Sequence, residues 1–382
     1  MIQLLYGNSQ RFRYRHGDIN ILGKISGNTD AVLPVSRSTY SLNGSSPTHF
    51  YVETHPINGA KYPWGTLTPA VLRLRDRPGH FNIEIPIDSP HLQGGQNQIA
   101  IEIENSQGAR EVLEAEFVWD ARPVSLPLDL SNLRDFESIQ EIAQVVDGDF
   151  TIDRTQNAIV SGAPVGSDTL LLLGSPYGSQ EATYDVRFGP GSKGWCFLGL
   201  SDFFVAHVEQ SPELGIKPGY SSAGLATLDY RGWPQIWIAW GDSLYDKADT
   251  WVVQTKKQLK LPIQAGITYR VRHQVILENG VSCARFRIWK KGNREPNLWV
   301  CQEDNRHLPP HLPRIDRASF GLFQYWGAPT QWSNIRVKAI DLTFKNVGFW
   351  EQGEGKWEMR ELGRLGVRKR GSAEFGKMMN DE

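Results

Sequence analysis

Cysteine is scarce in this sequence: Cys196, Cys283 and Cys301 are the three in 382 residues. Three are too few for the disulfide framework of a small secreted domain, and none has the CxxC or Cys/His spacing of a zinc site. One pair could form a bridge and leave a third thiol over. We favour three buried free thiols that act as small apolar residues.

Long apolar runs and net charge are also missing. No stretch approaches the roughly 20 residues that cross a bilayer, and the first residues lack the apolar segment of a secretory signal. A net charge of -1 gives no electrostatic case for nucleic acid or an anionic membrane. We expect no transmembrane segment and no nucleic-acid partner. Location stays open between a protein kept inside, export by another route, and a chain already processed.

Alternating strand patterns fill the first 120 residues. "FNIEIPI" places Phe81, Ile83 and Ile85 on one face, "NQIAIEIEN" repeats the pattern, and "TYSLNG" ends in an Asn-Gly turn. Short strands with such turns and no helical period predict an antiparallel β-sandwich over 1–120.

Strand patterns dominate again from residue 150 to 342, after a proline-containing linker and a short predicted helix with Ile139, Ile142 and Val145 at helical spacing. About ten strands without interleaved helices predict a larger double-sheet domain over 125–345. Most of the 13 tryptophans lie beyond residue 190, which implies a large core, a binding surface, or both. The predicted fold class is therefore all-β.

Two segments resemble known families. "SRSTYSLNGSSP", "RPGHFNIEIPI" and "LQGGQNQIAIEIENSQGAREVLEAEFVW" look like a bacterial Ig-like or cadherin-like domain over 17–119. "TYRVRHQVILENGVSCARFRIWKKGNREPNLW", "ASFGLFQYW" and "WSNIRVKAI" look like the C-terminal half of a concanavalin A-like or laminin G-like jelly roll, which would cover 125–345. The resemblance implies a glycan or protein ligand and an extracellular or cell-surface location.

No catalytic spacing accompanies this resemblance. Concanavalin-like glycanases carry E-x-D-x-E or E-x-D-x-x-E on one strand, and neither spacing occurs here. Glu102 and Glu104 lack the intervening Asp. Alginate-lyase-like jelly rolls use Q-I-H, where this chain has "QIW" at 235–237. His273 shares a strand face with Tyr269, Val271 and Val275, which favours a core histidine over a catalytic base.

A metal site has only weak support. Asp147, Asp149 and Asp153 in "DGDFTID" are the one loose candidate for a structural calcium ion, and the Gly and Glu positions of an EF-hand loop are wrong. We favour a polar turn that caps a strand. No cofactor is expected.

Two clusters in the second domain are candidates for ligand binding. In "GWPQIWIAWG", strand alternation separates Trp233, Gln235 and Trp237 from Ile236, Ile238 and Trp240. The Trp/Gln/Trp set could form a sugar platform, or it could be a second buried layer. The same choice applies to Tyr325, Trp326 and Trp332.

Arginines follow the hairpin that the Asn279-Gly280 turn predicts. Arg270 and Arg272 share one face, as do Arg285 and Arg287, so pairing would form an arginine ladder. A bare cluster of four would be repulsive. It is either a contact for an anion or ligand, or a solvated face neutralised by Asp or Glu on the next strand.

The last segment, 346–382, breaks the strand pattern. It is either a disordered tail or an arm that docks through Trp350, Trp357, Leu362 and Phe375, and "GKWEMRELGRLG" could form a short helix. Docking onto another copy would make the protein a homo-oligomer. The leading hypothesis is a non-catalytic, surface-associated protein that binds carbohydrate through its jelly roll. A self-assembling structural protein is the alternative, and a glycan-cleaving enzyme is third.

Overall fold

The chain is all-β, as the sequence predicts. Within the described residues the only helical elements are two single 3-10 turns, η1 (Leu133–Asp135) and η2 (Ile139–Glu141). The computed structural model describes residues 1–13, 18–25, 35–50, 52, 79–122, 124–162, 167–190, 198–204, 225–228, 234–238, 251–253, 261, 263–304, 317–327, 329–341, 349–353 and 356–360.

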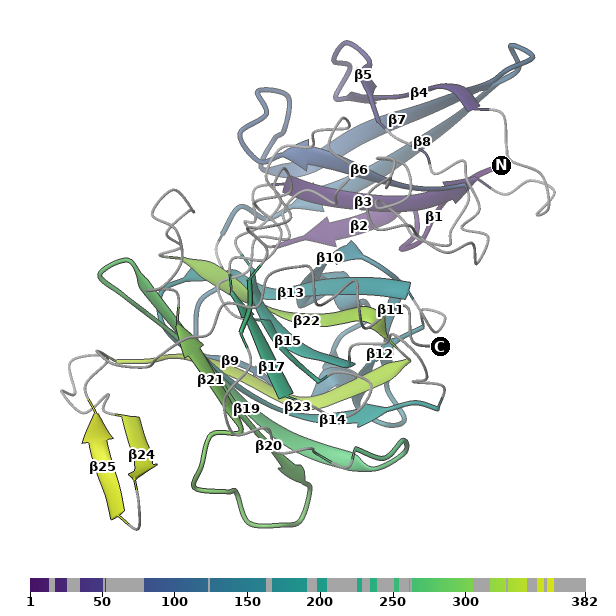
Figure 1. Ribbon diagram of the computed structural model, residues 1–382. Coiled ribbons are helices and arrows are strands. Elements are labelled where there is room, and N and C mark those ends of the chain that lie inside the picture. The colour runs from purple at the N-terminus through teal and green to yellow at the C-terminus, as the bar shows by residue number, and fades with distance from the viewer. Residues whose placement is uncertain are drawn as a thin grey trace.

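The strands up to Trp119 form two sheets, which Figure 1 draws as the upper part of the molecule. The three-stranded sheet has the order β1-β3-β6, and the five-stranded sheet has the order β2-β8-β7-β4-β5. Neighbours are antiparallel except β2 and β8, which are parallel. The strands are β1 (Ile2–Leu4), β2 (Ser9–Phe12), β3 (Asp18–Ile25), β4 (Val35–Leu42), β5 (Thr48–His49), β6 (His80–Pro86), β7 (Gly95–Asn105) and β8 (Arg110–Trp119).

Strand alternation builds the core of this first sandwich. Phe81, Ile83 and Ile85 of β6 are buried, as the sequence predicts, while Asn82 and Glu84 take the other face. The ring of Phe81 lies on β3 at Gly23, where an added Cβ would come within 2.1 Å of its Cζ. Only glycine leaves room for that ring.

The strands from Leu128 onward form two larger sheets. The seven-stranded sheet has the order β10-β13-β22-β15-β16-β17-β18, and the eight-stranded sheet has the order β11-β12-β23-β14-β19-β20-β21, with β9 also paired to β23. The strands are β9 (Leu128–Leu130), β10 (Ala143–Asp147), β11 (Phe150–Asp153), β12 (Ala158–Ser161), β13 (Ser167–Tyr177), β14 (Gln180–Phe188), β15 (Leu198–Phe204), β16 (Leu225–Leu228), β17 (Pro234–Ile238), β18 (Trp251–Val253), β19 (Thr268–Glu278), β20 (Val281–Lys290), β21 (Cys301–Asp304), β22 (Ala318–Gly327) and β23 (Thr330–Ala339).

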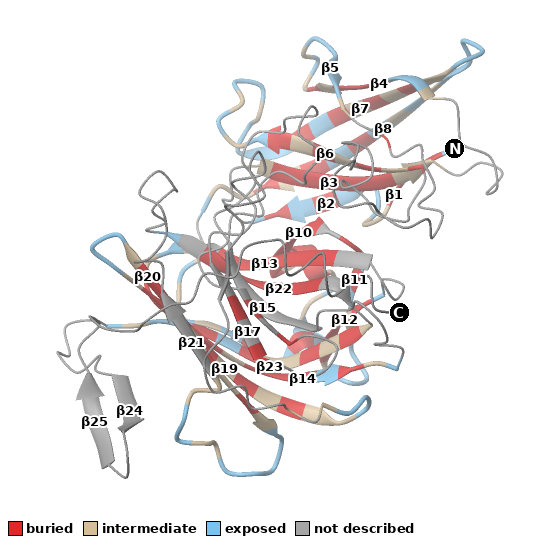
Figure 2. Cartoon of the chain, in the orientation of Figure 1, coloured by how far each residue is buried: buried red, intermediate tan, exposed pale blue. Residues whose placement is uncertain are grey.

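Side chains from these two sheets share one core, and Figure 2 shows buried residues along the strands of both. Tyr184, Phe286 and Trp332 come from the eight-stranded sheet and Phe320 comes from the seven-stranded one, all buried. Among the described residues, no strand up to Trp119 shares a sheet with a strand from Leu128 onward. The domain boundaries at 120 and 125, and the Ig-like and jelly-roll names, remain predictions.

The short helix expected before β10 is a single 3-10 turn. Ser138 and Glu141 form a reciprocal capping box around η2, which satisfies the backbone N–H groups at its start. Ile139, Ile142 and Val145 are all buried, as their spacing predicts, but Val145 already belongs to β10.

The tail contains strands where the sequence suggested a helix. β24 (Phe349–Gly353) and β25 (Lys356–Arg360) form an antiparallel two-stranded sheet. The expected helix in "GKWEMRELGRLG" is therefore wrong for its first half, because Lys356–Arg360 is extended. Trp350 and Trp357 lie in these strands, whereas Leu362 and Phe375 lie outside the described residues.

Two smaller expectations concern thiols and membranes. Cys283 is buried and forms no disulfide among the described residues, as predicted, while Cys196 and the side chain of Cys301 lie outside what the structure describes. Among the described residues, no helix has the length and apolar character needed to cross a membrane.

Candidate functional site

Four neighbouring strands of the eight-stranded sheet carry a polar outer face. On β19, Tyr269, Val271, His273 and Val275 are buried in the core, so alternation turns the residues between them outward. The same alternation operates on β14, β20 and β23. The cross-strand register then builds what we call the polar grid, whose three rows are Lys338, Glu181, Gln274 and Arg285; Arg336, Thr183, Arg272 and Arg287; and Asp185, Arg270 and Trp289.

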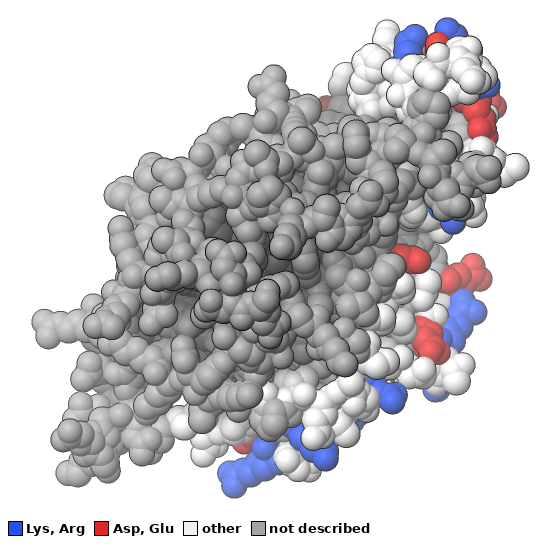
Figure 3. Space-filling model, turned by 45° about the vertical axis from the view of Figure 1, so that its right-hand side comes forward, with Lys and Arg blue, Asp and Glu red and all other residues white. Residues whose placement is uncertain are grey.

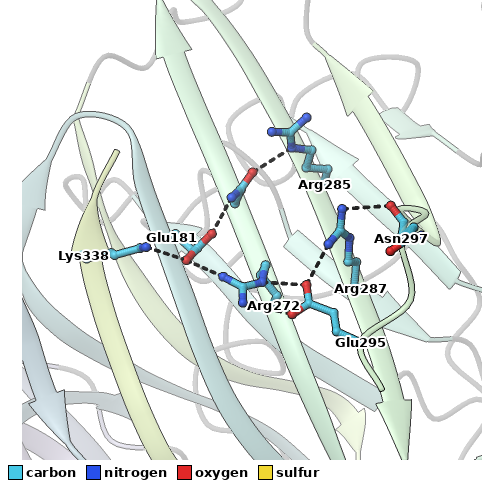
Figure 4. A network of polar contacts seen from close by, with 8 residues as sticks. Glu181, Arg272, Arg285, Arg287, Glu295, Asn297 and Lys338 are labelled. Carbon is cyan, nitrogen blue, oxygen red and sulfur yellow. Dashed lines mark hydrogen bonds and ion pairs between the residues drawn. The ribbon is translucent and has the colours of Figure 1, made fainter. Parts of the chain in front are cut away.

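Arg272 is the centre of the main ion network, drawn in Figure 4. Its Nη1 donates to Glu181 Oε1 at 2.6 Å, and its Nε and Nη2 donate to the two carboxylate oxygens of Glu295 at 2.8 and 3.0 Å. Arg287 Nη1 reaches Glu295 Oε1 at 2.7 Å, and Lys338 Nζ lies 3.1 Å from Glu181 Oε1. The network therefore alternates in charge from β23 across the sheet to the loop after β20.

Asp185 anchors the third row of the grid. Its side chain is fully buried and lies 2.8 Å from both Arg270 and Lys291. Asn334 donates to its second oxygen from a β-bulge in β23, where Asn334 takes a φ of 49°. The left-handed residue at the bulge re-aims its amide toward the carboxylate.

The three carboxyl groups stay ionised. Burial favours the protonated form of each, but the hydrogen bonds and charges of their partners outweigh burial and hold each pKa below its ordinary value. For Glu181 the bond from Gln274 is the largest opposing cause, and for Glu295 it is the bond from Arg272.

An indole covers the far end of the grid. Trp299, from the loop after β20, lies with its ring centroid 4.4 Å from Arg285 Cζ and 4.1 Å from Arg287 Cζ. Arg285 Nε donates to Gln274 Oε1 at 2.8 Å. Trp289 and Trp299 are both half-buried. Two aromatic rings thus flank a sheet surface rich in donors and acceptors.

The arginine ladder exists, and carboxylates lie within it. Arg272 faces Arg287 across the hairpin, while Glu181 and Asp185 come from the next strand, β14. The sequence did not single out Glu295, Trp299 or Trp289. Alternation with the buried Phe286 and Ile288 indicated that Trp289 faces outward. Glu295 and Trp299 lie in "REPNLW", the end of the segment that carries the jelly-roll resemblance.

The aromatic candidates have different outcomes. Trp332 is fully buried beside Phe150, with ring centroids 6.1 Å apart, so it belongs to the buried layer and is wrong as a sugar-contacting residue. Gln235 and Trp237 lie in β17 and Tyr325 and Trp326 in β22, but the structure describes only their backbone. Trp233 lies outside the described residues.

The structure describes the side chains of two of the three clustered aspartates, Asp149 and Asp153. Asp149 is exposed, and Asp153 accepts a hydrogen bond from the backbone N–H of Gln156 in the turn between β11 and β12. In the part of the chain that the structure describes, no group of three or more His, Cys, Asp or Glu residues could hold a metal ion. The polar-turn interpretation describes Asp153 correctly.

Comparison with known proteins finds matches among solved structures but none by sequence. No protein-family profile and no curated protein matches the sequence. Carbohydrate-binding module CBM66 from Bacillus subtilis is 13% identical with a TM-score of 0.33, over 52% of this chain and 95% of that chain. Lectin II from Ulex europaeus is 9% identical with a TM-score of 0.33, over 56% and 98%. The fibronectin(III)-like modules of Clostridium thermocellum CbhA are 14% identical with a TM-score of 0.20, over 32% and 100%. Values this low assign neither a family nor a ligand.

Proposed function

We propose that this chain is a non-catalytic binding protein that takes a carbohydrate on the polar grid of its second sandwich. The observation that carries the proposal is the combination of an ordered array of charged and amide groups with two half-buried indoles, Trp289 and Trp299, on a partly accessible sheet face. The grid replaces the Trp233/Gln235/Trp237 strand as the leading site, because its side chains are described and partly accessible.

The chemistry of the grid suits a sugar. Carboxylates accept hydrogen bonds from hydroxyl groups, and guanidinium groups donate to hydroxyl oxygens in a fixed fork. Indole rings offer a flat apolar surface to the C–H face of a pyranose ring. Because the ion pairs already hold these groups in place, the protein spends little conformational entropy when a ligand arrives.

The same ion pairs argue against glycan cleavage at this site. Glycoside hydrolysis needs one carboxylic acid that remains protonated, with a raised pKa, beside an ionised partner. Glu181, Asp185 and Glu295 all have lowered pKa values and are all engaged by cations. None is suited to donate a proton near neutral pH.

Substitution of the indoles tests the proposal. We expect Trp289→Ala and Trp299→Ala to weaken binding to the best ligand of a glycan panel by roughly three- to tenfold, which corresponds to the loss of one stacking contact. Affinity would be measured by isothermal titration calorimetry, and folding would be checked by thermal melting.

Trp237→Ala is the matched comparison, because it also removes an indole ring, but from β17 of the seven-stranded sheet. A loss confined to Trp237→Ala would move the site to β17. The absence of any glycan ligand, or hydrolysis of a glycan by the pure protein, would contradict the proposal altogether.

A second candidate function is self-assembly through the tail. Among the described strands, β24 and β25 pair only with each other. An isolated two-stranded hairpin is marginally stable in water, so a third strand supplied by another copy would stabilise it. This observation supports the tail as a docking arm.

A further inference from the structure

Positive charge concentrates at the end of β20 and in the loop that follows. Lys290, Lys291 and Arg294 are exposed there. Lys and Arg side chains gather at the lower edge of Figure 3, the height at which Figure 1 draws this loop. The carboxylate of the loop, Glu295, turns inward to Arg272 and Arg287 and is only 28% exposed. The outer rim of the loop is therefore cationic.

Asp185 pairs with Lys291, but the described carboxylates of this site leave Lys290 and Arg294 unpaired, because each carboxylate is already shared by two cations. Glu181 serves Arg272 and Lys338, Glu295 serves Arg272 and Arg287, and Asp185 serves Arg270 and Lys291. In the described part of the chain, neither Lys290 nor Arg294 has a carboxylate within ion-pair distance. An anion in solution would therefore find uncompensated charge at this edge.

Arg272 in the middle of the arginine ladder and Arg285 at its end differ in their electrostatic environment. Hydrogen bonding to Glu295 raises the pKa of Arg272, so negative charge is concentrated around that residue. Burial first, and then the charge of Arg287, lower the pKa of Arg285. Positive charge is thus less well stabilised at the end of the ladder that lies under Trp299.

We propose that the cationic edge, defined as Arg285, Arg287, Lys290, Lys291, Arg294 and Trp299, binds the carboxylate or sulfate groups of an acidic glycan. The proposal rests on the proposed function and names the class of its ligand. Guanidinium forks match the planar geometry of a carboxylate and two oxygens of a sulfate. The ring of Trp299, which lies over Arg285 and Arg287, offers a surface for the sugar that carries the anion.

The confinement of the charge favours a glycan over a nucleic acid. The whole chain has a net charge of -1, so the cationic edge is a local feature rather than part of a general excess. An acidic sugar needs only a few cations beside one aromatic ring.

The test compares dextran, dextran sulfate and polygalacturonate as ligands of the full chain across a salt titration. We expect the charged polymers to bind and neutral dextran to bind more weakly, with affinity for the charged polymers falling as salt rises. Lys290→Gln with Arg294→Gln should weaken binding to charged polymers roughly tenfold and reduce the salt slope by about two. Binding by only one charged polymer would assign the anion as sulfate or as carboxylate.

Arg11→Gln with Arg37→Gln is the control, since it makes the same change in net charge at two exposed positions of the first sandwich. This control variant should bind like the parent chain. Equal, salt-independent binding of neutral and charged polymers would overturn the acidic-glycan inference and leave the proposed function standing. Binding of duplex DNA as tight as that of the charged polymers would overturn the glycan assignment itself.

Discussion

His273 lies between the two sheets of the second sandwich. It is fully buried, with its ring edge-on to Phe320 at 5.0 Å and to Phe286 at 6.5 Å between centroids. The prediction of a core histidine is confirmed. Burial lowers the pKa of His273 to about 3, because the charged imidazolium would lose its hydration inside the core.

This histidine should make the protein acid-sensitive in a defined range. In the unfolded chain it binds a proton below pH 6.5, whereas in the folded chain it stays neutral until about pH 3. The unfolded state therefore binds more protons as the pH falls, and stability is lost. Between pH 6.5 and 4.5 the free energy of unfolding should fall by roughly 2–3 kcal/mol from this residue.

Urea denaturation of His273→Leu across that range measures the effect. The variant should show a flatter dependence of unfolding free energy on pH than the parent chain, whatever its absolute stability. The carboxyl groups with lowered pKa values contribute mainly near and below their ordinary values of 4.5 and 3.8, and they contribute to the parent chain and the variant alike. Exposed His91→Gln should keep the parent slope; a parent slope of zero would contradict the prediction.

Trp332 shows how one extra residue in a strand makes a prediction from strand alternation fail. Simple alternation along "TQWSNIRVKA" puts Trp332 on the face opposite Ile335 and Val337. The bulge at Asn334 adds one residue, so all three side chains are buried together. Asn334 has a left-handed backbone conformation and donates a hydrogen bond to Asp185, which lies 149 residues away in the sequence. No local sequence pattern reveals this partner.

The β19–β20 hairpin is the element that the sequence describes best. Its alternation and its Asn279-Gly280 turn, both residues with positive φ, are local properties, and both were predicted correctly. Its ion-pair partners were not identified, because Asp185 and Glu181 come from a strand 85 and 91 residues earlier. Sequence pattern thus indicates which face is polar, while the contents of the site depend on long-range pairing.

The β24–β25 hairpin, in contrast, was not predicted from the sequence. The segment "GKWEMRELGRLG" suggested a short helix, but short apolar patterns do not separate helix from strand. The glycines at 353 and 355 were the local signal for a turn between strands. The register pairs Gly353 with Lys356, so the chain reverses between these two residues.

The hairpin should need cover to persist, because two strands alone bury little surface. We expect deletion of residues 346–382 to lower the mass measured by light scattering or the melting temperature of the remainder. Deletion of 361–382 is the control: it keeps both strands and should behave like the full chain. If the longer deletion also matches the full chain in mass and melting temperature, the docking-arm hypothesis loses its support.

The two sandwiches meet through buried contacts rather than through the linker alone. Leu22 of β3 is buried within the core cluster of the second sandwich. Phe150 N donates to Tyr6 Oη at 3.0 Å, and Gln144 Nε2 donates to the backbone oxygen of Asp18 at 2.5 Å. In Figure 1, β10 accordingly lies directly below β2 and β3. We infer that the sandwiches unfold together in one transition, even though each has its own sheets.

The pair Gln140 and Gln10 tests this coupling, because the two side chains join η2 to β2 and are both buried. Gln140 Nε2 donates to Gln10 Oε1 at 2.8 Å, with the two residues 3% and 5% exposed. Gln140→Leu should lower the free energy of unfolding by roughly 1–3 kcal/mol, because it leaves the Gln10 carbonyl buried without its donor. The double change with Gln10→Leu should recover most of that loss, since Gln10 Nε2 otherwise serves only the exposed Gly7 carbonyl at 2.8 Å. Urea denaturation of the single and double variants gives the coupling energy. Additive losses, or two separate transitions in the parent chain, would show that the sandwiches are independent.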